Sequence, residues 1–146
     1  MKQTRHLGVY GLIIKNGKIA LVLKSRGAYT GKLDLPGGSF EHGELPTKTL
    51  IREIKEELGC DVLDYQIFDS SPVTVQWTMN GEEVLMHHIG IFYKVNLKDY
   101  NLKSDTDNQD SLGSNWYDID KLDESITSPL LWIELTKILN DNDKIV

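Results

Sequence analysis

The chain contains the stretch Leu35-Pro36-Gly37-Gly38-Ser39-Phe40-Glu41-His42-Gly43-Glu44, followed after seven residues by Arg52-Glu53-Ile54-Lys55-Glu56-Glu57-Leu58-Gly59-Cys60. The segment Leu45–Leu58, which joins the two runs, has the apolar spacing of an amphipathic helix. At about 100° per residue, one stripe of this helix carries four aliphatic side chains, and the neighbouring stripe carries three carboxylates. The aliphatic residues are Leu50, Ile51, Ile54 and Leu58, and the acids are Glu53, Glu56 and Glu57. The pattern predicts a helix that packs its aliphatic stripe on a sheet.

The acidic stripe opposes the stability of this helix. Like charges three or four residues apart repel by a few tenths of a kcal/mol per pair, and anions near a helix C-terminus are disfavoured by the macrodipole. Arg52 and Lys55 offset only part of this cost. A divalent cation would convert the repulsion into ligation, because carboxylate oxygens are hard ligands that suit Mg²⁺ or Mn²⁺. From helical spacing alone, a solvated acidic face remains the alternative.

The pattern resembles the Nudix box of the Nudix hydrolase family: a Gly, five residues, a Glu, seven residues, then Arg-Glu-aliphatic-any-Glu-Glu-any-Gly-aliphatic. All fixed polar and glycine positions match over the 23 residues Gly38–Cys60, and Cys60 occupies the last aliphatic position. Pro46 departs from the residues that many members carry there and suits a first helical turn, so we expect a shifted helix start. The resemblance implies the Nudix fold, an α+β structure with an α/β/α sandwich around a central mixed β-sheet, in a single domain over residues 1–146.

The resemblance also implies a reaction and a cofactor. Members of the family hydrolyse a nucleoside diphosphate linked to another group, by attack of water on a phosphorus, with Mg²⁺ as cofactor and Mn²⁺ as a substitute. In this chain Glu53, Glu56 and Glu57 would be the metal ligands. A backbone carbonyl of Gly38 or Gly37 would join them, because glycines let the loop turn back over the helix start.

Further roles follow from the same resemblance. Arg52 and Glu44 would face each other and fix the loop to the helix. Glu53 is our first candidate for the base that removes the proton of water, and Asp110, in a later loop, is the competing acid. Arg26 resembles the phosphate-contacting base of the family. The expected catalytic set is Glu44, Arg52, Glu53 and Glu57, with Arg26 and Asp110 as weaker candidates for substrate binding.

A few aromatic residues outside the box have two interpretations. Tyr29 and Trp77 could stack on a nucleobase, although single aromatic residues more often belong to a core or a surface. His87 and His88 are adjacent in an alternating strand, so one side chain points inward and the other outward. We therefore do not expect them to form a metal-binding pair.

The remaining sequence predicts the other elements. Two hairpins are expected around Asn16-Gly17 and Asn80-Gly81, because Asn-Gly between β-rich runs is a strong hairpin signal. Loops are expected at Ser25–Gly31 and Lys98–Gly113, and a helix at Pro129–Leu139 after the capping residue Ser128. The expected strands are Leu7–Ile14, Ile19–Leu23, Lys32–Leu35, Val73–Met79, Val84–Val95 and Asn115–Ile119.

Composition limits the classes of function. The chain has 146 residues, 40% apolar residues and a net charge of −6, which fits one globular domain. The seven bases before Asp34 contrast with eleven acids from Asp99 onward, and this acidic end would repel duplex nucleic acid. Cys60 is the only cysteine, which excludes an intrachain disulfide and a Cys-rich zinc site. No apolar run is long enough for a membrane span and no signal peptide is visible, so we expect a cytoplasmic protein.

Alternatives to the hydrolase remain. A nucleotide-sensing Nudix domain without turnover usually loses box carboxylates, whereas this chain keeps them all. A Nudix-type isomerase needs a second Cys and His metal site, and Cys60 lies inside the box, so we set it aside. The substrate stays open among NTPs, ADP-ribose, nucleotide sugars, dinucleoside polyphosphates and capped RNA ends. We expect a small-molecule nucleotide as partner, and the oligomeric state stays open, with a homodimer as one candidate.

Overall fold

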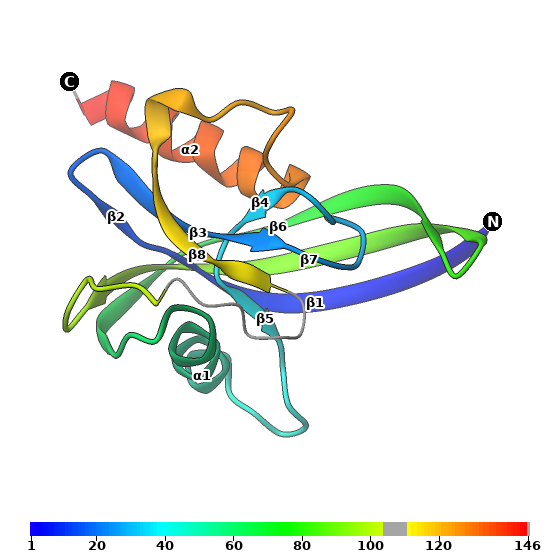
Figure 1. Ribbon diagram of the computed structural model, residues 1–146, viewed down its shortest axis with the longest axis horizontal. Coiled ribbons are helices and arrows are strands. Elements are labelled where there is room, and N and C mark those ends of the chain that lie inside the picture. Colours follow the sequence, from blue (N-terminus) through cyan, green and yellow to red (C-terminus); the bar gives the residue numbers. More distant parts are fainter. Residues whose placement is uncertain (104–110, 146) are drawn as a thin grey trace.

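The structure is a computed structural model that describes residues 1–103 and 111–145 (Figure 1). Within these residues, five strands precede the first helix, and three more strands precede the second. The elements are β1 (Lys2–Leu12), β2 (Ile14–Lys15), β3 (Lys18–Lys24), β4 (Leu33–Asp34), β5 (Gly37–Ser39), α1 (Pro46–Leu58), β6 (Val62–Met79), β7 (Glu82–Leu97), β8 (Ser111–Asp118), a 3₁₀ turn (Ile119–Lys121) and α2 (Pro129–Ile145).

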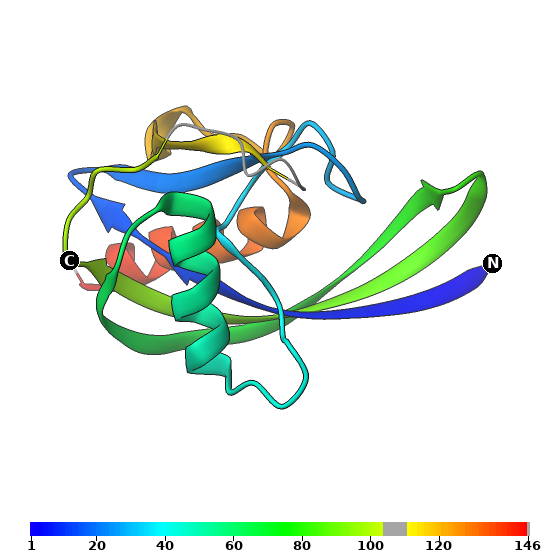
Figure 2. The ribbon, with the colours of Figure 1, turned by 60° about the horizontal axis from the view of Figure 1, so that its bottom comes forward.

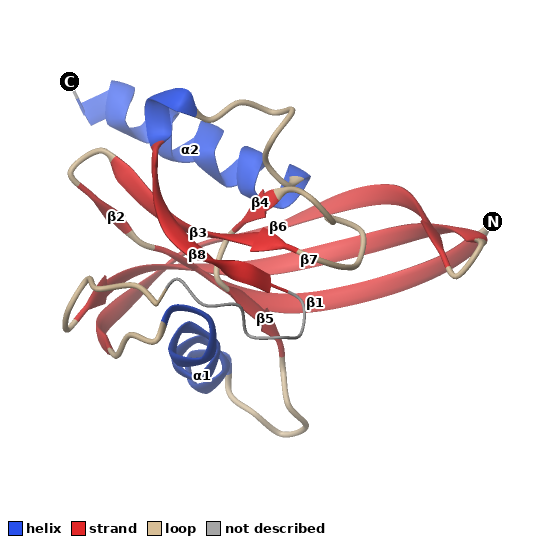
Figure 3. Ribbon diagram, viewed as in Figure 1, coloured by secondary structure: helices blue, strands red, loops and turns tan. Residues whose placement is uncertain are grey.

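The strands form two four-stranded sheets between the helices (Figure 3). The first sheet has the order β5-β1-β7-β6, and it is mixed because β1 runs parallel to β7 while the other pairs are antiparallel. In the second sheet β3 pairs with β2, β4 and β8, all antiparallel. Helices α1 and α2 lie on opposite sides of the strands. The predicted α+β architecture with a mixed sheet is confirmed, and a second, antiparallel sheet is added to it.

Each side of the strands has its own core, because alternate residues of the central strands point in opposite directions. On the α1 side, Val9 and Val22 pack with Leu50, Ile54 and Leu58 of the helix. On the α2 side the core contains Tyr10, Leu21, Phe92, Leu131 and Leu135, among others. The aliphatic stripe predicted for the box helix is therefore the stripe that it buries, except Ile51, which is 37% exposed.

The first hairpin is present only in part. Asn16 and Gly17 adopt positive φ values of 53° and 76°, as a tight hairpin turn requires, but only β2 pairs with β3 across that turn. The predicted strand Leu7–Ile14 instead ends at Leu12, and its body joins the other sheet. The reason is its long parallel pairing with β7, from Lys2 opposite Val84 to Leu12 opposite Lys94.

The second hairpin is longer than predicted. Its turn at Asn80-Gly81 is confirmed by φ values of 52° and 79°. However, β6 begins at Val62 rather than Val73, and β7 runs two residues further at each end. The first half of β6 lacks a clear alternation because its register shifts between Ile67 and Asp69. The ends of β1, β6 and β7, residues 2–7, 73–79 and 82–88, project from the body as a three-stranded arm (Figure 2).

The two helices differ modestly from expectation. Helix α1 starts at Pro46, one residue later than predicted, with Leu45 as its N-cap. It ends at Leu58, and its C-cap Gly59 adopts a left-handed φ of 73°. Helix α2 extends past Leu139 to Ile145. Its first turn is capped by the Ser128 hydroxyl, which accepts a hydrogen bond from the Leu131 amide at 3.1 Å.

The later part of the chain differs from the prediction in where β8 begins. The strand predicted at Asn115–Ile119 begins earlier, at Ser111, so the predicted loop is shorter than expected. Asp110, the alternative base, lies outside the described residues. Within the described part of the chain, neither helix combines the length and the apolar character that crossing a lipid bilayer demands.

Candidate active site

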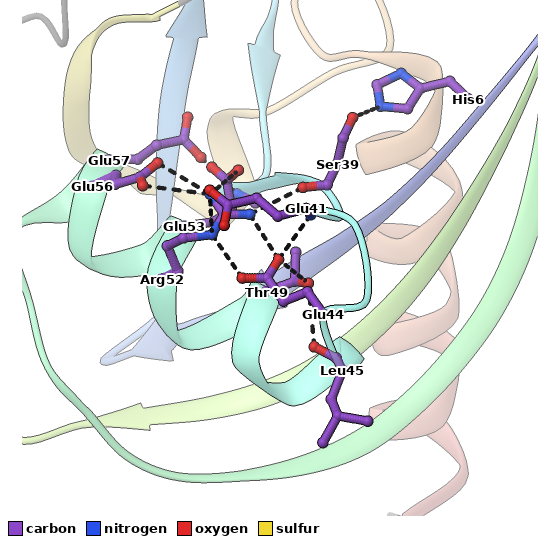
Figure 4. Close-up of polar contacts among 11 residues, drawn as sticks. His6, Ser39, Glu41, Glu44, Leu45, Thr49, Arg52, Glu53, Glu56 and Glu57 are labelled. Atoms are coloured by element: carbon purple, nitrogen blue, oxygen red, sulfur yellow. Dashed lines mark hydrogen bonds and ion pairs between the residues drawn. The ribbon is translucent and has the colours of Figure 1, made fainter.

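Arg52 joins the loop before α1 to the helix itself (Figure 4). Its guanidinium grips Glu44 with two hydrogen bonds, from Nε to Oε2 and from Nη2 to Oε1, both 2.9 Å long. Its Nη2 also donates to the carbonyl of Ser39 at 3.1 Å. This paired geometry is stronger and more directional than a single ion pair. The Arg52–Glu44 contact expected from the box is therefore present, and it extends to β5.

Glu44 is fixed from three directions. Besides Arg52, the Thr49 hydroxyl donates to its Oε1 at 2.6 Å, and the Glu41 amide donates to the same oxygen at 3.0 Å. The hydrogen bonds from Arg52, then those from Thr49 and Glu41, lower the pKa of Glu44 to about 2. The carboxylate therefore stays ionised over the whole physiological range, and the loop stays attached to α1.

Glu53 lies against the backbone of β5 at a glycine. Its Oε1 accepts a hydrogen bond from Arg52 Nη1 at 3.0 Å. A Cβ atom added to Gly38 would lie only 2.8 Å from this oxygen, a distance that real Cβ atoms essentially never show. Because Gly38 has no side chain, the Glu53 carboxylate can lie directly against the backbone of β5.

Glu57 is buried next to the preceding glycine. Its Oε1 accepts a hydrogen bond from the Gly37 amide at 2.7 Å, and the residue is only 5% exposed. Gly37 has a φ of 146°, and a Cβ there would lie 2.1 Å from the carbonyl oxygen of Val9. Both glycines proposed to offer a carbonyl to a metal therefore touch a box carboxylate, Gly37 through Glu57 and Gly38 through Glu53.

Carboxylates are suitable ligands for Mg²⁺, but the side chains of Glu53, Glu56 and Glu57 do not converge on one point in this structure. Arg52 Nη1 donates to Glu53 at 3.0 Å and to both oxygens of Glu56 at 3.4 Å, so the guanidinium neutralises both acids. Within residues 1–103 and 111–145, no three His, Cys, Asp or Glu side chains are close enough to hold a metal ion in this arrangement. Oxygen-only donors at the end of a glycine loop still suit a hard dication.

A cavity of about 440 Å³ opens beside these groups, a size typical of small-molecule sites. Gly38 and Glu53 line it where it meets the box, and Trp77 and Met86 line it from the arm. Arg26 lines it from the loop after β3. The structure thus brings together Glu53, Arg26, Tyr29 and Trp77, which the sequence singled out separately. Glu44, Arg52, Glu56 and Glu57 are not among the described residues that line it.

The two adjacent histidines separate as predicted. His88 is 2% exposed and lines the cavity, whereas His87 lines a groove on the opposite face of the arm with Arg5 and Thr74. What the sequence interpretation missed is the polar content of the cavity wall. His6, Tyr10, Lys24, Asp34 and His88 were not expected to line it.

Asp34 is the clearest missed signal. It is an acid between Leu33 and Leu35 in an apolar run, and it is 3% exposed in the structure. Its Oδ1 accepts hydrogen bonds from the Ser128 hydroxyl at 2.7 Å and the Leu35 amide at 2.9 Å. Burial raises its pKa, and those hydrogen bonds work against the shift. A buried acid in such a run points to a polar site on that side of the strand.

Comparison with known proteins gives a family match. The model of the NUDIX domain matches residues 4–136. Among solved structures, a MutT NUDIX hydrolase from Burkholderia pseudomallei superposes with a TM-score of 0.70 at 22% identity, over 91% of this chain and 97% of that chain. A NUDIX hydrolase from Nitrosomonas europaea superposes with a TM-score of 0.63 at 22% identity, over 95% of this chain and 90% of that chain.

Two relatives align over little more than a third of the chain. An ADP-ribose pyrophosphatase of Methanocaldococcus jannaschii is 42% identical over 53 residues, which are 36% of this chain and 31% of that protein. An 8-oxo-dGTP diphosphatase of Escherichia coli is 32% identical over 56 residues, which are 38% of this chain and 43% of that protein. The aligned part thus spans less than half of each relative.

Proposed function

The chain belongs to the NUDIX family, and from this premise we propose that it is a Mg²⁺-dependent pyrophosphohydrolase acting on a nucleoside diphosphate linked to another group. The observation that carries the proposal is the convergence of Glu53, Gly38 and Arg26 on one cavity. Hydrolysis of a bound pyrophosphate requires a carboxylate, a backbone segment that can lie close to the phosphates, and a positively charged side chain, and these three residues supply them.

The metal belongs at the edge of this cavity. Glu53, Glu56 and Glu57 would hold Mg²⁺, with Mn²⁺ as a substitute, together with a carbonyl of Gly37 or Gly38. When bound, the cation neutralises phosphate oxygens and lowers the pKa of the attacking water. For the acids to serve as ligands, Arg52 must release its 3.4 Å contacts to Glu56, while its shorter bonds to Glu44 keep the loop in place.

The other side chains accept the proton, orient the base and bind the phosphates. Glu53 lines the cavity, so its carboxylate is placed to accept the proton of water. Arg52 holds Glu53 Oε1 at 3.0 Å and thereby orients it. Arg26, which also lines the cavity, supplies positive charge to the pyrophosphate. The fixed Glu44 carboxylate anchors Arg52, so the base keeps its direction throughout the reaction.

Two of the relatives support a small nucleotide as substrate. One is named for ADP-ribose and the other for 8-oxo-dGTP, and both compounds are nucleoside diphosphates extended by another group. We propose a substrate of this class, in the cytoplasm, and no duplex nucleic acid or membrane partner. The acidic end of the chain from Asp99 onward agrees with this choice.

The test is a phosphate-release assay over a panel of NTPs, ADP-ribose, nucleotide sugars and dinucleoside polyphosphates, coupled to a pyrophosphatase or a phosphatase. We expect turnover that needs Mg²⁺, stops in excess EDTA and returns with Mg²⁺ or Mn²⁺. Glu53→Gln and Glu57→Gln should each lower kcat by roughly two orders of magnitude or more. Glu124→Gln, an exposed acid far from the box in sequence, is the matched control and should retain wild-type activity.

Two results would overturn the proposal. Full turnover in excess EDTA would exclude the metal-dependent mechanism. Tight nucleotide binding with no turnover on any substrate of the panel would favour a sensing domain instead.

A further inference from the structure

His88 is held between two tyrosines in the wall of the cavity. Its Nε2 is 2.7 Å from the Tyr10 hydroxyl, and its Nδ1 is 2.7 Å from the Tyr29 hydroxyl. All three residues are at most 6% exposed, and all three line the cavity. The tyrosines come from β1 and from the loop between β3 and β4, so His88 on β7 joins three separate segments.

Gly8 makes the hydrogen bond between Tyr10 and His88 possible. Gly8 and Gly90 are paired across β1 and β7, so the sheet carries no side chain at this point. A Cβ at Gly8 would lie 2.3 Å from the Tyr10 hydroxyl oxygen, which means that the Tyr10 ring lies flat along its own strand. Its hydroxyl thereby reaches His88, two residues beyond the pair on β7.

The rings form a continuous aromatic wall. Tyr29 stacks on His88 with a centroid distance of 5.5 Å, and His6 stacks on His88 at 4.5 Å and 14°. The His6 Nε2 atom lies 2.8 Å from the Ser39 hydroxyl, which joins this wall to the strand of Gly38. Such a surface fits the face of a planar ring that carries hydrogen-bonding atoms at its edge.

The chain of hydrogen bonds Tyr10–His88–Tyr29, called the bridge below, contains one more polar hydrogen than its two hydrogen bonds use. Burial, and then the charges of His6 and Lys24, lower the pKa of His88 to about 3, so the imidazole is neutral. A neutral imidazole has one N–H donor and one acceptor nitrogen. With two tyrosine hydroxyls, the bridge holds three polar hydrogens for two hydrogen bonds. One hydroxyl is therefore left to donate to a third group.

Tyr29 is the better placed of the two hydroxyls. The Tyr10 hydroxyl lies over Gly8 within the sheet, whereas Tyr29 belongs to the segment that carries Arg26 along the cavity. If Tyr10 donates to Nε2, then Nδ1 carries the hydrogen and donates to Tyr29, and the Tyr29 hydrogen points elsewhere. Hydrogen bonds in such a chain strengthen one another.

We propose that the Tyr29 hydroxyl donates to an acceptor atom on the planar base of the substrate, and that Tyr10 and His88 are positioning residues that direct its hydrogen there. This inference rests on the proposed function for the identity of the ligand as a nucleotide. Tyr29 would be a specificity-determining residue that binds the base in the ground state and the transition state alike.

Binding and turnover separate this role from a structural one. We expect Tyr29→Phe to raise KM about tenfold with kcat within about twofold, as for the loss of one hydrogen bond in uniform binding. Isothermal titration with the α,β-methylene analogues of ADP and GDP should show the same rise in Kd. Ribose 5-diphosphate, which lacks a base, should bind wild type and Tyr29→Phe equally.

Variants at the positioning residue complete the test. His88→Phe should weaken binding of the analogues, and His88→Gln should restore part of it, because an amide also offers one acceptor and a donor. His88→Phe combined with Tyr29→Phe should bind them no more weakly than the weaker single variant, since both changes remove the same contact. His87→Phe, the neighbour on the opposite face, should equal wild type.

The inference is overturned if Tyr29→Phe binds the analogues as tightly as wild type, or if it loses equal affinity for ribose 5-diphosphate. It is also overturned if kcat falls while Kd is unchanged. A failure of the proposed function looks different, because wild type would then bind the analogues in the titration yet release no phosphate from any substrate.

Discussion

At position 38, one missing methyl group decides where the Glu53 carboxylate lies. We expect Gly38→Ala to push this carboxylate away, because the new Cβ would start 2.8 Å from Oε1. Displacement of a reacting group by about 1 Å can cost about 100-fold in rate, so kcat should fall at least about tenfold. Unfolding by urea should show a loss of only about 1–3 kcal/mol. Ser70→Ala, at an exposed position of β6, is the control, and a kcat for Gly38→Ala equal to that of Ser70→Ala would contradict the prediction.

At position 52, the hydrogen-bonding geometry of the arginine side chain matters more than its positive charge. Lysine at this position keeps the charge but cannot make the two 2.9 Å bonds to Glu44 and the 3.0 Å bond to Glu53 together. We expect Arg52→Lys to lower kcat by roughly 10- to 100-fold with a smaller change in KM. The exposed Lys48→Gln on the same helix is the control. Wild-type kcat in Arg52→Lys would show that charge alone suffices.

At the scale of elements, the sequence predicted what local periodicity determines and missed what pairing determines. The box helix was placed within one residue, because its apolar stripe and Pro46 are local signals. The partner of β1 was wrong, because the Asn16-Gly17 turn predicts a neighbour in sequence, while eleven residue pairs with β7 outweigh it. The part of β6 before Val73 was missed for the same reason, since this irregular stretch is paired along β7 and has no clear pattern of its own.

Helix α2 is attached to β6 through a partly buried cluster of charged residues. Lys137 forms hydrogen bonds with Asp69 and Ser71, and it lies 3.6 Å from Glu134. Glu134 is fully buried, and within the described residues neither of its oxygens has a hydrogen-bond partner. Burial, and then the neighbouring Asp69, raise the pKa of Glu134 to about 8. The folded protein therefore binds this proton more tightly than the unfolded chain does.

This proton makes stability depend on pH. The stabilisation is complete below the unfolded pKa of 4.5 and is lost as pH rises through about 8, because unfolding releases the proton in that window. We expect Glu134→Gln to match wild type near pH 5 and to melt roughly 5 °C higher near pH 9. Melting curves across pH 5–9 provide the measurement. A constant difference between the two proteins at every pH would contradict the role of this proton.

At the scale of the whole molecule, the cavity collects residues that no local pattern connects. Trp77 on the arm, Tyr29 on a loop and Gly38 at the start of the box meet only because β1 runs parallel to β7 and carries β5 along its other edge. The sequence could identify Glu53, Arg52 and Glu44, since their spacing is itself the signal. It could not place His88 or Tyr10 in the wall, because that depends on the parallel pairing of β1 with β7 and on the space that Gly8 leaves for the Tyr10 ring.

The same assembly predicts how the whole molecule responds to metal. In the described arrangement, Glu53 and Glu56 are neutralised by Arg52, and Glu57 accepts a hydrogen bond from Gly37. Mg²⁺ that binds only the folded protein stabilises it by about 2.7 kcal/mol at 100 times its Kd. For a chain of this length we expect Tm to rise on the order of 5–10 °C from EDTA to saturating Mg²⁺.

Loss of a ligand should remove most of that rise without destabilising the metal-free protein. Glu57→Gln keeps an oxygen for the Gly37 amide and removes one of three like charges, so its Tm in EDTA should lie within a few degrees of wild type. Its Tm should respond little to Mg²⁺, because a neutral amide is a poorer ligand for a hard dication. The exposed Glu124→Gln should show the full wild-type rise. If Glu57→Gln and Glu53→Gln both show it too, the carboxylate stripe is a solvated face and the metal lies elsewhere.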